Sequence, residues 1–463
     1  MSDMPPKEFR KAGHEVVDWI ADYLEGVRDY PVLSRIQPGD LLKVLPAAAP
    51  DSPELFEDIL EDFRNLVVPG VTHWNHPRFH AYFSVSASAP GILAEMLIAA
   101  LNVNGMLWKS CPSATELEQV TMKWLAQWMG LPDDYFGIIY DTASISTMHA
   151  LACAREWKDP EARTRGSLPN LTVYTSEQAH SSVEKGAIAI GIGQDNVRKI
   201  AVDENYAMRI DKLKAAVASD LEAGKTPCCF VPSVGTTGTS SIDPVDHVID
   251  IAEQHGAWVH IDASYAGSAA IVPECQHILS GAARAHSLVV NPHKWLFTPI
   301  DLSAFYTRRP DILRRAFSLV PEYLRTAEDP HAINFMDYGV PLGRRFRALK
   351  LWFVMRYFGR DRCVEILRNH LAWTRDLARQ IAAHPRFELA APVPFSLICF
   401  RLKASDEANR ELMDRVNASG VCFLSHTLLD GRFVLRLAVG NIKVTREDLD
   451  VSWTAIQEIA ETL

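Results

Sequence analysis

The feature that most constrains the fold is an alternation of helical stretches with short apolar runs between residues 88 and 350. Each run has the length of a buried strand and ends in polar or small residues. Buried strands separated by helices are typical of a mainly parallel sheet with helices on its faces. The pattern therefore predicts an α/β fold. The clearest strand candidates are residues 171–174, 228–231, 258–261 and 287–290.

Helical patterns precede this region. Apolar residues at three- and four-residue intervals predict a helix that begins near Phe9 and ends at Gly26. Ser52 followed by Pro53 predicts the N-cap and first position of a second helix. Two helices cannot enclose a core of their own. We therefore expect residues 1–87 to be an N-terminal helical segment that packs on the rest of the chain or on a second subunit.

A mixed pattern follows, from which we expect a large α/β domain at residues 88–350 and a small α+β domain at 351–463. An Asp430-Gly431 pair between two apolar runs is typical of a hairpin turn. Thr445 and Asp448 predict the cap of a final helix. The other predicted elements are helices at 345–358 and 361–384 and strands at 396–402, 421–425 and 433–439.

Composition excludes several classes of protein. The 463 residues are 48% hydrophobic and 22% charged, which is typical of a globular chain and not of a fibrous or disordered one. Since 47 basic residues face 57 acidic ones, the net charge of −10 argues against nucleic acid as a partner. The sequence shows no long apolar stretch of the kind that would predict a signal peptide or a membrane span. The scattered cysteines lack a metal-ligand spacing, so we expect a cytoplasmic protein with reduced thiols and no metal.

Polar residues follow the predicted strands at the edge where ligands bind in α/β sheets. His180 comes soon after the first strand, Thr237 after the second, Asp262 directly after the third and Lys294 soon after the fourth. Because the carboxyl ends of parallel strands share one edge, we expect these four side chains to converge.

Lys294 and Asp262 have chemistry that fits an aldehyde cofactor. A lysine in a water-poor pocket has a lowered pKa, which lets its amine form a Schiff base. An acid at the sheet edge is what pyridoxal phosphate needs to hold its pyridine nitrogen protonated. The alternatives are a surface lysine and a helix-capping aspartate.

His180 and the segment 141–147 complete the predicted site. A histidine in this position can stack on a pyridine ring, although a loop histidine is more often structural. The hydroxyl-rich segment 141–147 leads into a helix, whose free backbone N–H groups suit a phosphate dianion. Hydroxyl-rich helix starts are common without a ligand, so the order of the motifs carries the argument.

Six motifs in this order resemble the group II pyridoxal-phosphate decarboxylases, most closely the aromatic L-amino acid decarboxylases. The resemblance covers nearly the whole chain and implies a fold-type I enzyme with pyridoxal 5'-phosphate as cofactor. It also implies a homodimer whose active site lies at the interface. The motifs are THW at 72–74, AYF at 81–83, QAHSS at 178–182, HIDASYAG at 260–267, NPHKW at 291–295 and PLGRRF at 341–346.

The resemblance also implies roles for single residues. Lys294 would carry the cofactor, His180 would stack on its ring, and Asp262 would bind the pyridine nitrogen. Thr237 would lie near the ring. The phosphate side would be lined by Ala143, Ser144, Asn291 and His293.

The same resemblance implies that Tyr323, in the stretch PEYL at 321–324, is the catalytic residue that protonates Cα. Aldehyde-forming relatives commonly carry Phe at this position. The sequence therefore favours simple decarboxylation to an arylalkylamine and CO2 over the oxidative reaction of an aromatic acetaldehyde synthase.

The predicted substrates are tyrosine, DOPA, phenylalanine or tryptophan. Ser396 matches a position where a small residue separates phenolic from indolic substrates, and it favours a hydroxylated ring. A decarboxylase of histidine or glutamate and a non-catalytic binding protein of the same fold are the alternatives. The remaining predicted pocket residues are Trp74, Tyr82 and Phe83, which match aromatic-lining positions of the family or are ordinary core, and Asn104 and Met106, where this chain departs from the Ile-Gly-Phe of its relatives.

Overall fold

The computed structural model describes all residues except 1–2, 169, 320–323, 325, 327 and 329–330. The chain divides into two compact units. The terminal unit comprises Met1–Ser84, His384–Glu388 and Phe400–Leu463, and the central unit comprises Val85–Ala383 and Leu389–Cys399. The division into three domains at residues 87 and 350 stays a prediction.

The central unit contains a seven-stranded sheet in the order β1-β7-β6-β5-β4-β2-β3. Strands β2 to β6 are parallel where they pair, and β7 is antiparallel to both β6 and β1. The predicted α/β fold with a mainly parallel sheet is therefore confirmed. The strands are β1 (Phe136–Tyr140), β2 (Leu171–Ser176), β3 (Val197–Ile200), β4 (Thr226–Val231), β5 (Trp258–Asp262), β6 (Ser287–Val290) and β7 (Ser303–Thr307).

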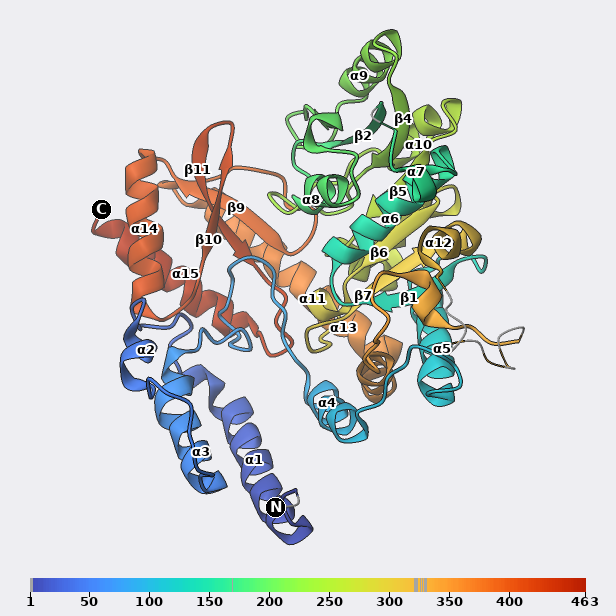
Figure 1. Cartoon of the computed structure of the whole chain (residues 1–463). Coiled ribbons are helices and arrows are strands. Elements are labelled where there is room, and N and C mark those ends of the chain that lie inside the picture. The colour runs from blue at the N-terminus through green and yellow to red at the C-terminus, as the bar shows by residue number, and fades with distance from the viewer. Residues whose placement is uncertain (1–2, 169, 320–323, 325, 327, 329–330) are drawn as a thin grey trace. The chain divides into compact units, whose positions relative to one another are not determined.

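Helices cover both faces of this sheet (Figure 1). Connections between parallel strands are right-handed, so a reversal in the direction of travel moves the connecting helix to the other face. The chain moves outward from β2 to β3 and back from β3 through β4 to β5. One face is therefore covered by α6 (Ala143–Lys158) and α8 (Ser182–Ala189), and the other by α9 (Ile210–Glu222) and α10 (Val245–Gln254).

The middle strands form because their residues are buried on both faces. Every residue of β5 and β6 is buried, which explains their continuous apolar character. The short helix α11 (Pro292–Trp295) begins directly after β6, with Asn291 as its N-cap. This turn places Lys294 at the carboxyl edge of the sheet.

The other helices of the central unit pack around the sheet. The two helices predicted at 345–358 and 361–384 correspond to α13, which is interrupted where Gly359 adopts a positive φ of 65°. This glycine was the visible sequence signal for the interruption. The remaining helices are α4 (Ala89–Leu101), α5 (Pro112–Met129), α7 (Ala162–Arg165), α12 (Pro310–Phe317) and α13 (Ala348–Ala383).

The terminal unit carries helices and most of a four-stranded sheet. The predicted first helix is confirmed, and Thr445 and Asp448 form the predicted capping box. The sheet has the order β10-β11-β9-β8. Its elements are α1 (Pro6–Gly26), α2 (Asp40–Val44), α3 (Phe56–Asp62), α14 (Asp406–Ser419), α15 (Arg446–Glu461), β8 (Phe387–Leu389), β9 (Leu397–Leu402), β10 (Ser425–Leu429) and β11 (Arg432–Ala438).

Two local predictions in this unit were wrong. Helix α3 begins at Phe56 and not after Ser52, because the chain is still extended at Leu55, whose side chain is 67% exposed and outside the apolar face. The strand predicted at 421–425 lies at 425–429, because Asp430 and Gly431 both have positive φ and form a tight turn that pairs Leu429 with Arg432.

Candidate active site

Lys294 lies in α11 with its amine held inside the central unit. Its Nζ donates to the Ser264 hydroxyl at 3.3 Å. Burial lowers the pKa of the Lys294 amine, and the negative charge of Asp262 opposes this shift. A larger neutral fraction of the amine makes it a better nucleophile toward an aldehyde.

The residue after Lys294 anchors the short helix. The indole N–H of Trp295 donates to His370 Nδ1 at 3.0 Å, and Trp295 is fully buried. The Tyr265 ring stacks on the indole with centroids 5.0 Å apart. The residue that follows Lys294 is therefore held by a buried hydrogen bond and a stacked ring.

Asp262 is the last residue of β5 and is 6% exposed. Its Oδ1 accepts a hydrogen bond from the Ser264 backbone N–H at 3.1 Å. Its own backbone N–H donates to the Pro232 carbonyl at 3.0 Å, and its carbonyl accepts from the Val234 N–H at 2.8 Å. The carboxylate is thus fixed at the carboxyl edge of the sheet.

His180 follows β2 and is exposed in the single chain. The Ser182 backbone N–H donates to His180 Nδ1 at 3.1 Å, so Nε2 carries the proton in the neutral ring. Burial of part of the ring lowers the pKa of His180, Asp262 raises it, and Lys294 and Lys185 lower it. The ring therefore lies within electrostatic reach of both Asp262 and Lys294, as the strand-end pattern predicted.

Thr237 is exposed on the loop that follows β4. The amino end of α6 offers backbone donors, because its N-cap Thr142 makes no side-chain capping bond and its first turn contains no acidic residue. Ala143 and Ser144 are the first two residues of this helix, and both are at least partly exposed. Their backbone N–H groups point out of the helix end, as an anion site requires.

Asn291 and His293 are buried beside Lys294 in the sequence. Within the described part of the chain, Asn291 Oδ1 is buried without a hydrogen-bond partner. His293 Nδ1 accepts from the Leu302 backbone N–H at 2.9 Å, and burial lowers the pKa of His293 to about 3. The imidazole is therefore neutral at ordinary pH.

The predicted pocket residues of the central unit differ in accessibility. Asn104 is exposed, and its Oδ1 accepts from the Arg344 backbone N–H at 2.9 Å. Met106 is half-buried and packs with Leu107. Ser396 is fully buried, and its hydroxyl pairs with the Tyr265 hydroxyl.

The other predicted pocket residues belong to the terminal unit. Trp74 and Tyr82 are exposed and stack at 5.7 Å between ring centroids. Phe83 is buried beneath the Arg436 guanidinium, which lies 5.4 Å from its ring centroid. Tyr323 lies outside the described residues.

Sequence reasoning missed several residues of this region. Ser264 is the hydrogen-bond partner of Lys294, and the motif HIDASYAG contains it. His370 and Tyr265 support Trp295, although nothing in the local pattern at His370 signals that contact. Asp243 is a buried acid behind the sheet edge, and its only signal was an acidic residue before Pro244.

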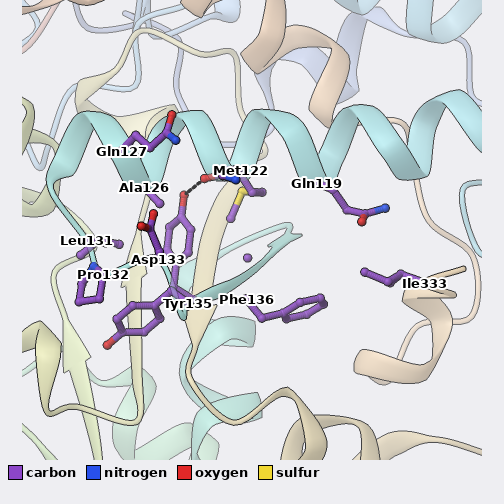
Figure 2. A pocket seen from close by; sticks show the side chains of 13 residues that line it. Gln119, Met122, Ala126, Gln127, Leu131, Pro132, Asp133, Tyr135, Phe136 and Ile333 are labelled. Atoms are coloured by element: carbon purple, nitrogen blue, oxygen red, sulfur yellow. Dashed lines mark hydrogen bonds between the residues drawn. The ribbon is translucent and has the colours of Figure 1, made fainter. Parts of the chain in front are cut away.

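A separate cavity of ≈ 200 Å³ lies between α5 and the start of β1 (Figure 2). Tyr306 closes one side and donates its phenol hydrogen to the Met122 carbonyl at 2.9 Å. None of His180, Thr237, Asp262 and Lys294 lines this cavity.

Two further kinds of feature are absent from the described residues. No helix there is both long and apolar enough to cross a membrane. No group of three or more histidine, cysteine, aspartate and glutamate side chains in that part of the chain is arranged to hold a metal ion.

The chain matches known proteins along its whole length. Residues 38–403 match the pyridoxal-dependent decarboxylase conserved domain. A phenylacetaldehyde synthase of Arabidopsis thaliana is 39% identical over 100% of this chain and 98% of its own length. Tyrosine decarboxylase 2 of Narcissus pseudonarcissus is 38% identical, with coverage of 100% and 96%. The crystal structure of Oryza sativa TDC with PLP and tryptamine superposes with a TM-score of 0.97 at 35% identity, covering 100% of this chain and 99% of that one.

Proposed function

Because the chain belongs to the pyridoxal-dependent decarboxylase family, we propose that it converts aromatic L-amino acids to arylalkylamines and CO2. The cofactor of this fold-type I family is pyridoxal 5'-phosphate. The observation that carries the proposal is the convergence of the Lys294 amine, the Asp262 carboxylate and the His180 ring at one edge of the sheet.

The residues at this edge fit the cofactor. A buried amine of lowered pKa suits its aldehyde, an acid that forms no ion pair among the described residues suits its pyridine nitrogen, and an uncapped helix end suits its phosphate. The unsatisfied Asn291 amide oxygen also indicates that a polar group is missing from this region. When bound, the cofactor supplies an electron sink for the pair left behind by CO2.

Each chain residue has a distinct proposed task. Lys294 would hold the cofactor through its aldehyde and would be replaced there by the substrate amine. Asp262 keeps the pyridine nitrogen protonated, and the neutral His180 ring stacks on the pyridine. Ala143, Ser144, Asn291 and His293 line the phosphate, and Thr237 lies near the ring.

The fate of the substrate carbon depends on Tyr323. We propose that its phenol delivers the proton to Cα, which completes the amine. The second candidate is oxidative: the amino acid, O2 and water would yield the aldehyde, CO2, ammonia and hydrogen peroxide. The 39% identity to a phenylacetaldehyde synthase favours testing it, since overall similarity does not separate the two activities.

An aromatic pocket is proposed for the substrate ring. The substrate-binding roles of Trp74, Tyr82, Phe83, Asn104 and Met106 are drawn from the family resemblance; of the three aromatic side chains, Trp74 and Tyr82 are exposed and Phe83 is buried. Because the Ser396 hydroxyl pairs with Tyr265, we propose that any effect of Ser396 on ring preference acts through Tyr265. Histidine and glutamate remain the alternative substrates, and binding without catalysis is the alternative to enzyme activity.

We also propose a cytoplasmic homodimer with the site at the interface. Helix α4 supports this assembly, because Leu93, Leu97 and Leu101 on it are 52%, 47% and 58% exposed. Exposed apolar side chains that gather on one helix mark an association surface. Light scattering of the purified holoenzyme measures the mass, and a monomer near 51.7 kDa would contradict the dimer.

Product analysis tests the proposed reaction. The holoenzyme is incubated with tyrosine, DOPA, phenylalanine, tryptophan, histidine and glutamate, and amines are separated from aldehydes. We expect arylalkylamines without stoichiometric peroxide. Tyr323→Phe should shift the product toward aldehyde, whereas Tyr357→Phe, at a tyrosine 72% exposed on α13, should not. Aldehyde as the main product of the unmodified chain would support the oxidative candidate, and turnover of histidine or glutamate alone would refute the aromatic assignment.

A further inference from the structure

Asp243 is a buried acid that the proposed reaction does not use. It is 1% exposed and lies between the loop after β4 and the start of α10. In the described ranges it forms no ion pair with lysine, arginine or histidine. Its Oδ1 accepts from the Met208 backbone N–H and its Oδ2 from the Ser233 N–H, both at 2.8 Å. Burial raises the pKa of Asp243 to about 7, although these two donors lower it.

The Ser233 end of this contact lies beside Asp262. Residues 233 and 262 form an isolated parallel bridge just beyond β4. Asp262 donates its N–H to Pro232 and accepts at its carbonyl from Val234, so it is held on both sides of Ser233. The backbone N–H of Asp243 donates to the Ser233 carbonyl at 2.9 Å. Asp243 thus binds both polar groups of the Ser233 backbone, which is the central residue of the segment that holds Asp262.

The loop between Ser233 and Asp243 also packs closely on the strand end that it borders. Gly235 has a φ of 88°, and a Cβ added there would lie 2.5 Å from the Ala266 Cβ. Beyond it, Thr236, Thr239 and Ser241 form a chain of hydroxyl contacts at 3.1 and 2.6 Å. Because the loop is closely packed, Asp243 and the segment around Asp262 have little room to move independently of each other.

We propose that Asp243 is a positioning residue that fixes the Asp262 carboxylate against the pyridine nitrogen of the cofactor through the segment 232–234. The inference rests on the proposed role of Asp262. Asp243 itself does not touch the cofactor. In Asp243→Asn, only one side-chain oxygen remains, so either the Ser233 or the Met208 N–H would face an NH2 donor in place of its acceptor, and the segment would relax.

The alternative is that Asp243 only stabilises the fold. Asp220 provides a matched control, because it is a 6% exposed acid of the same unit. Its carboxylate accepts from Tyr174 at 2.8 Å and from Arg198 at 2.6 Å. It lies near the end of α9, which leads into the start of β4 and not to the carboxyl edge of the sheet.

The test compares the holoenzymes of Asp243→Asn, Asp220→Asn and Asp262→Asn. The readouts are the rate of cofactor loss on dilution, the visible absorbance maximum and the thermal unfolding temperature. We expect Asp243→Asn to lose cofactor at least about 10-fold faster and to shift the absorbance in the same direction as Asp262→Asn. Asp220→Asn should lower the unfolding temperature but keep both cofactor readouts within about twofold.

The outcomes separate the two levels of the account. If Asp262→Asn changes neither cofactor readout, the proposed role of Asp262 fails. If Asp262→Asn changes them while Asp243→Asn behaves like Asp220→Asn, only the positioning role is overturned.

If Asp243→Asn does not fold, amide hydrogen exchange of the unmodified holoenzyme tests the proposal instead. The Ser233 and Met208 amides should then be protected within about 10-fold of the Asp262 amide. Exchange of the Ser233 amide more than about 100-fold faster than that of Asp262 would overturn the proposal.

Discussion

Asp220 and Asp262 are both 6% exposed, but Asp220 lies near the end of helix α9, whereas Asp262 is the last residue of strand β5. Arg198 binds the Asp220 carboxylate through Nε and Nη2, at distances of 2.6 to 3.0 Å. Asp262, by contrast, forms no ion pair within the part of the chain that the structure describes, and its Oδ1 accepts only from a backbone N–H. The two carboxylates are therefore equally buried but differ in whether a described cationic side chain pairs with them.

The difference supports the proposed cofactor site beside Asp262. Burying an unpaired carboxylate is costly, and folded proteins usually match it with a cation or several hydrogen bonds. For Asp220 the chain itself supplies the cation, which is the Arg198 guanidinium. At the Asp262 edge the family's cofactor can supply one through its protonated pyridine nitrogen. The comparison predicts that charge removal at the two residues has different consequences.

The largest effect is expected from Lys294→Ala. Loss of the amine should reduce amine production by about 1,000-fold or more, because no lysine would hold the cofactor covalently for exchange with the substrate amine. The visible absorbance of the holoenzyme should disappear or shift to that of free cofactor. Activity within about 10-fold of the unmodified chain would contradict the proposed role of Lys294.

Removing the charge of Asp262 should mainly reduce activity, whereas removing the charge of Asp220 should mainly reduce stability. Asp262→Asn should reduce kcat by about 100-fold, because the pyridine nitrogen loses its counter-charge. Asp220→Asn should leave kcat within about twofold but lower the free energy of unfolding by about 3 kcal/mol, because Arg198 is left without its partner. Steady-state kinetics and urea unfolding measure the two quantities, and equal effects on both in both variants would break the comparison.

A smaller effect, on substrate preference, is expected from the Ser396–Tyr265 hydroxyl pair. Ser396→Ala and Tyr265→Phe each remove one partner of the same hydroxyl pair. If Ser396 acts through Tyr265, both variants should change the ratio of tyrosine to phenylalanine turnover in the same direction, by about 10-fold or less. A change in Ser396→Ala alone would show that the serine contacts the substrate directly.

The smallest expected effect is a shift in pH dependence. Burial lowers the pKa of Lys294, and Asp262 partly restores it. The neutral amine therefore becomes available at a lower pH than in a solvent-exposed lysine. Asp262→Asn removes the restoring charge, so the midpoint of the pH profile for cofactor rebinding should move to lower pH. A midpoint that moves upward, or that moves equally in Asp220→Asn, would contradict this assignment.

The sequence predicted the positions of Lys294 and Asp262 at the carboxyl edge of the sheet better than it predicted the contacts that support them. Lys294 and Asp262 were accessible to prediction because each follows an apolar strand by at most a few residues, so local pattern and sheet geometry agree. The Tyr265 and Ser396 hydroxyls meet across 131 residues of sequence, and no local periodicity reports such a contact. Ser396 was consequently assigned to the substrate pocket without any sign of its burial.

The local errors had local causes. The apolar residues 421–424 are buried or partly buried but lie before β10, which begins at Ser425, and the turn at Asp430-Gly431 decided which residues paired. Ser52 and Pro53 are a favourable N-cap and first helical residue, but the helix and its apolar face begin only at Phe56. Tertiary pairing overrode propensity in the first case, and burial did so in the second.

The central claim is that Lys294 holds the cofactor opposite Asp262. Borohydride reduction of the holoenzyme, followed by proteolysis and peptide mass mapping, tests it most directly. The account predicts one pyridoxyl-modified peptide, with the modification on Lys294 and absent from Lys294→Ala. Modification of a different lysine, or a reduced holoenzyme without a pyridoxyl peptide, would contradict it.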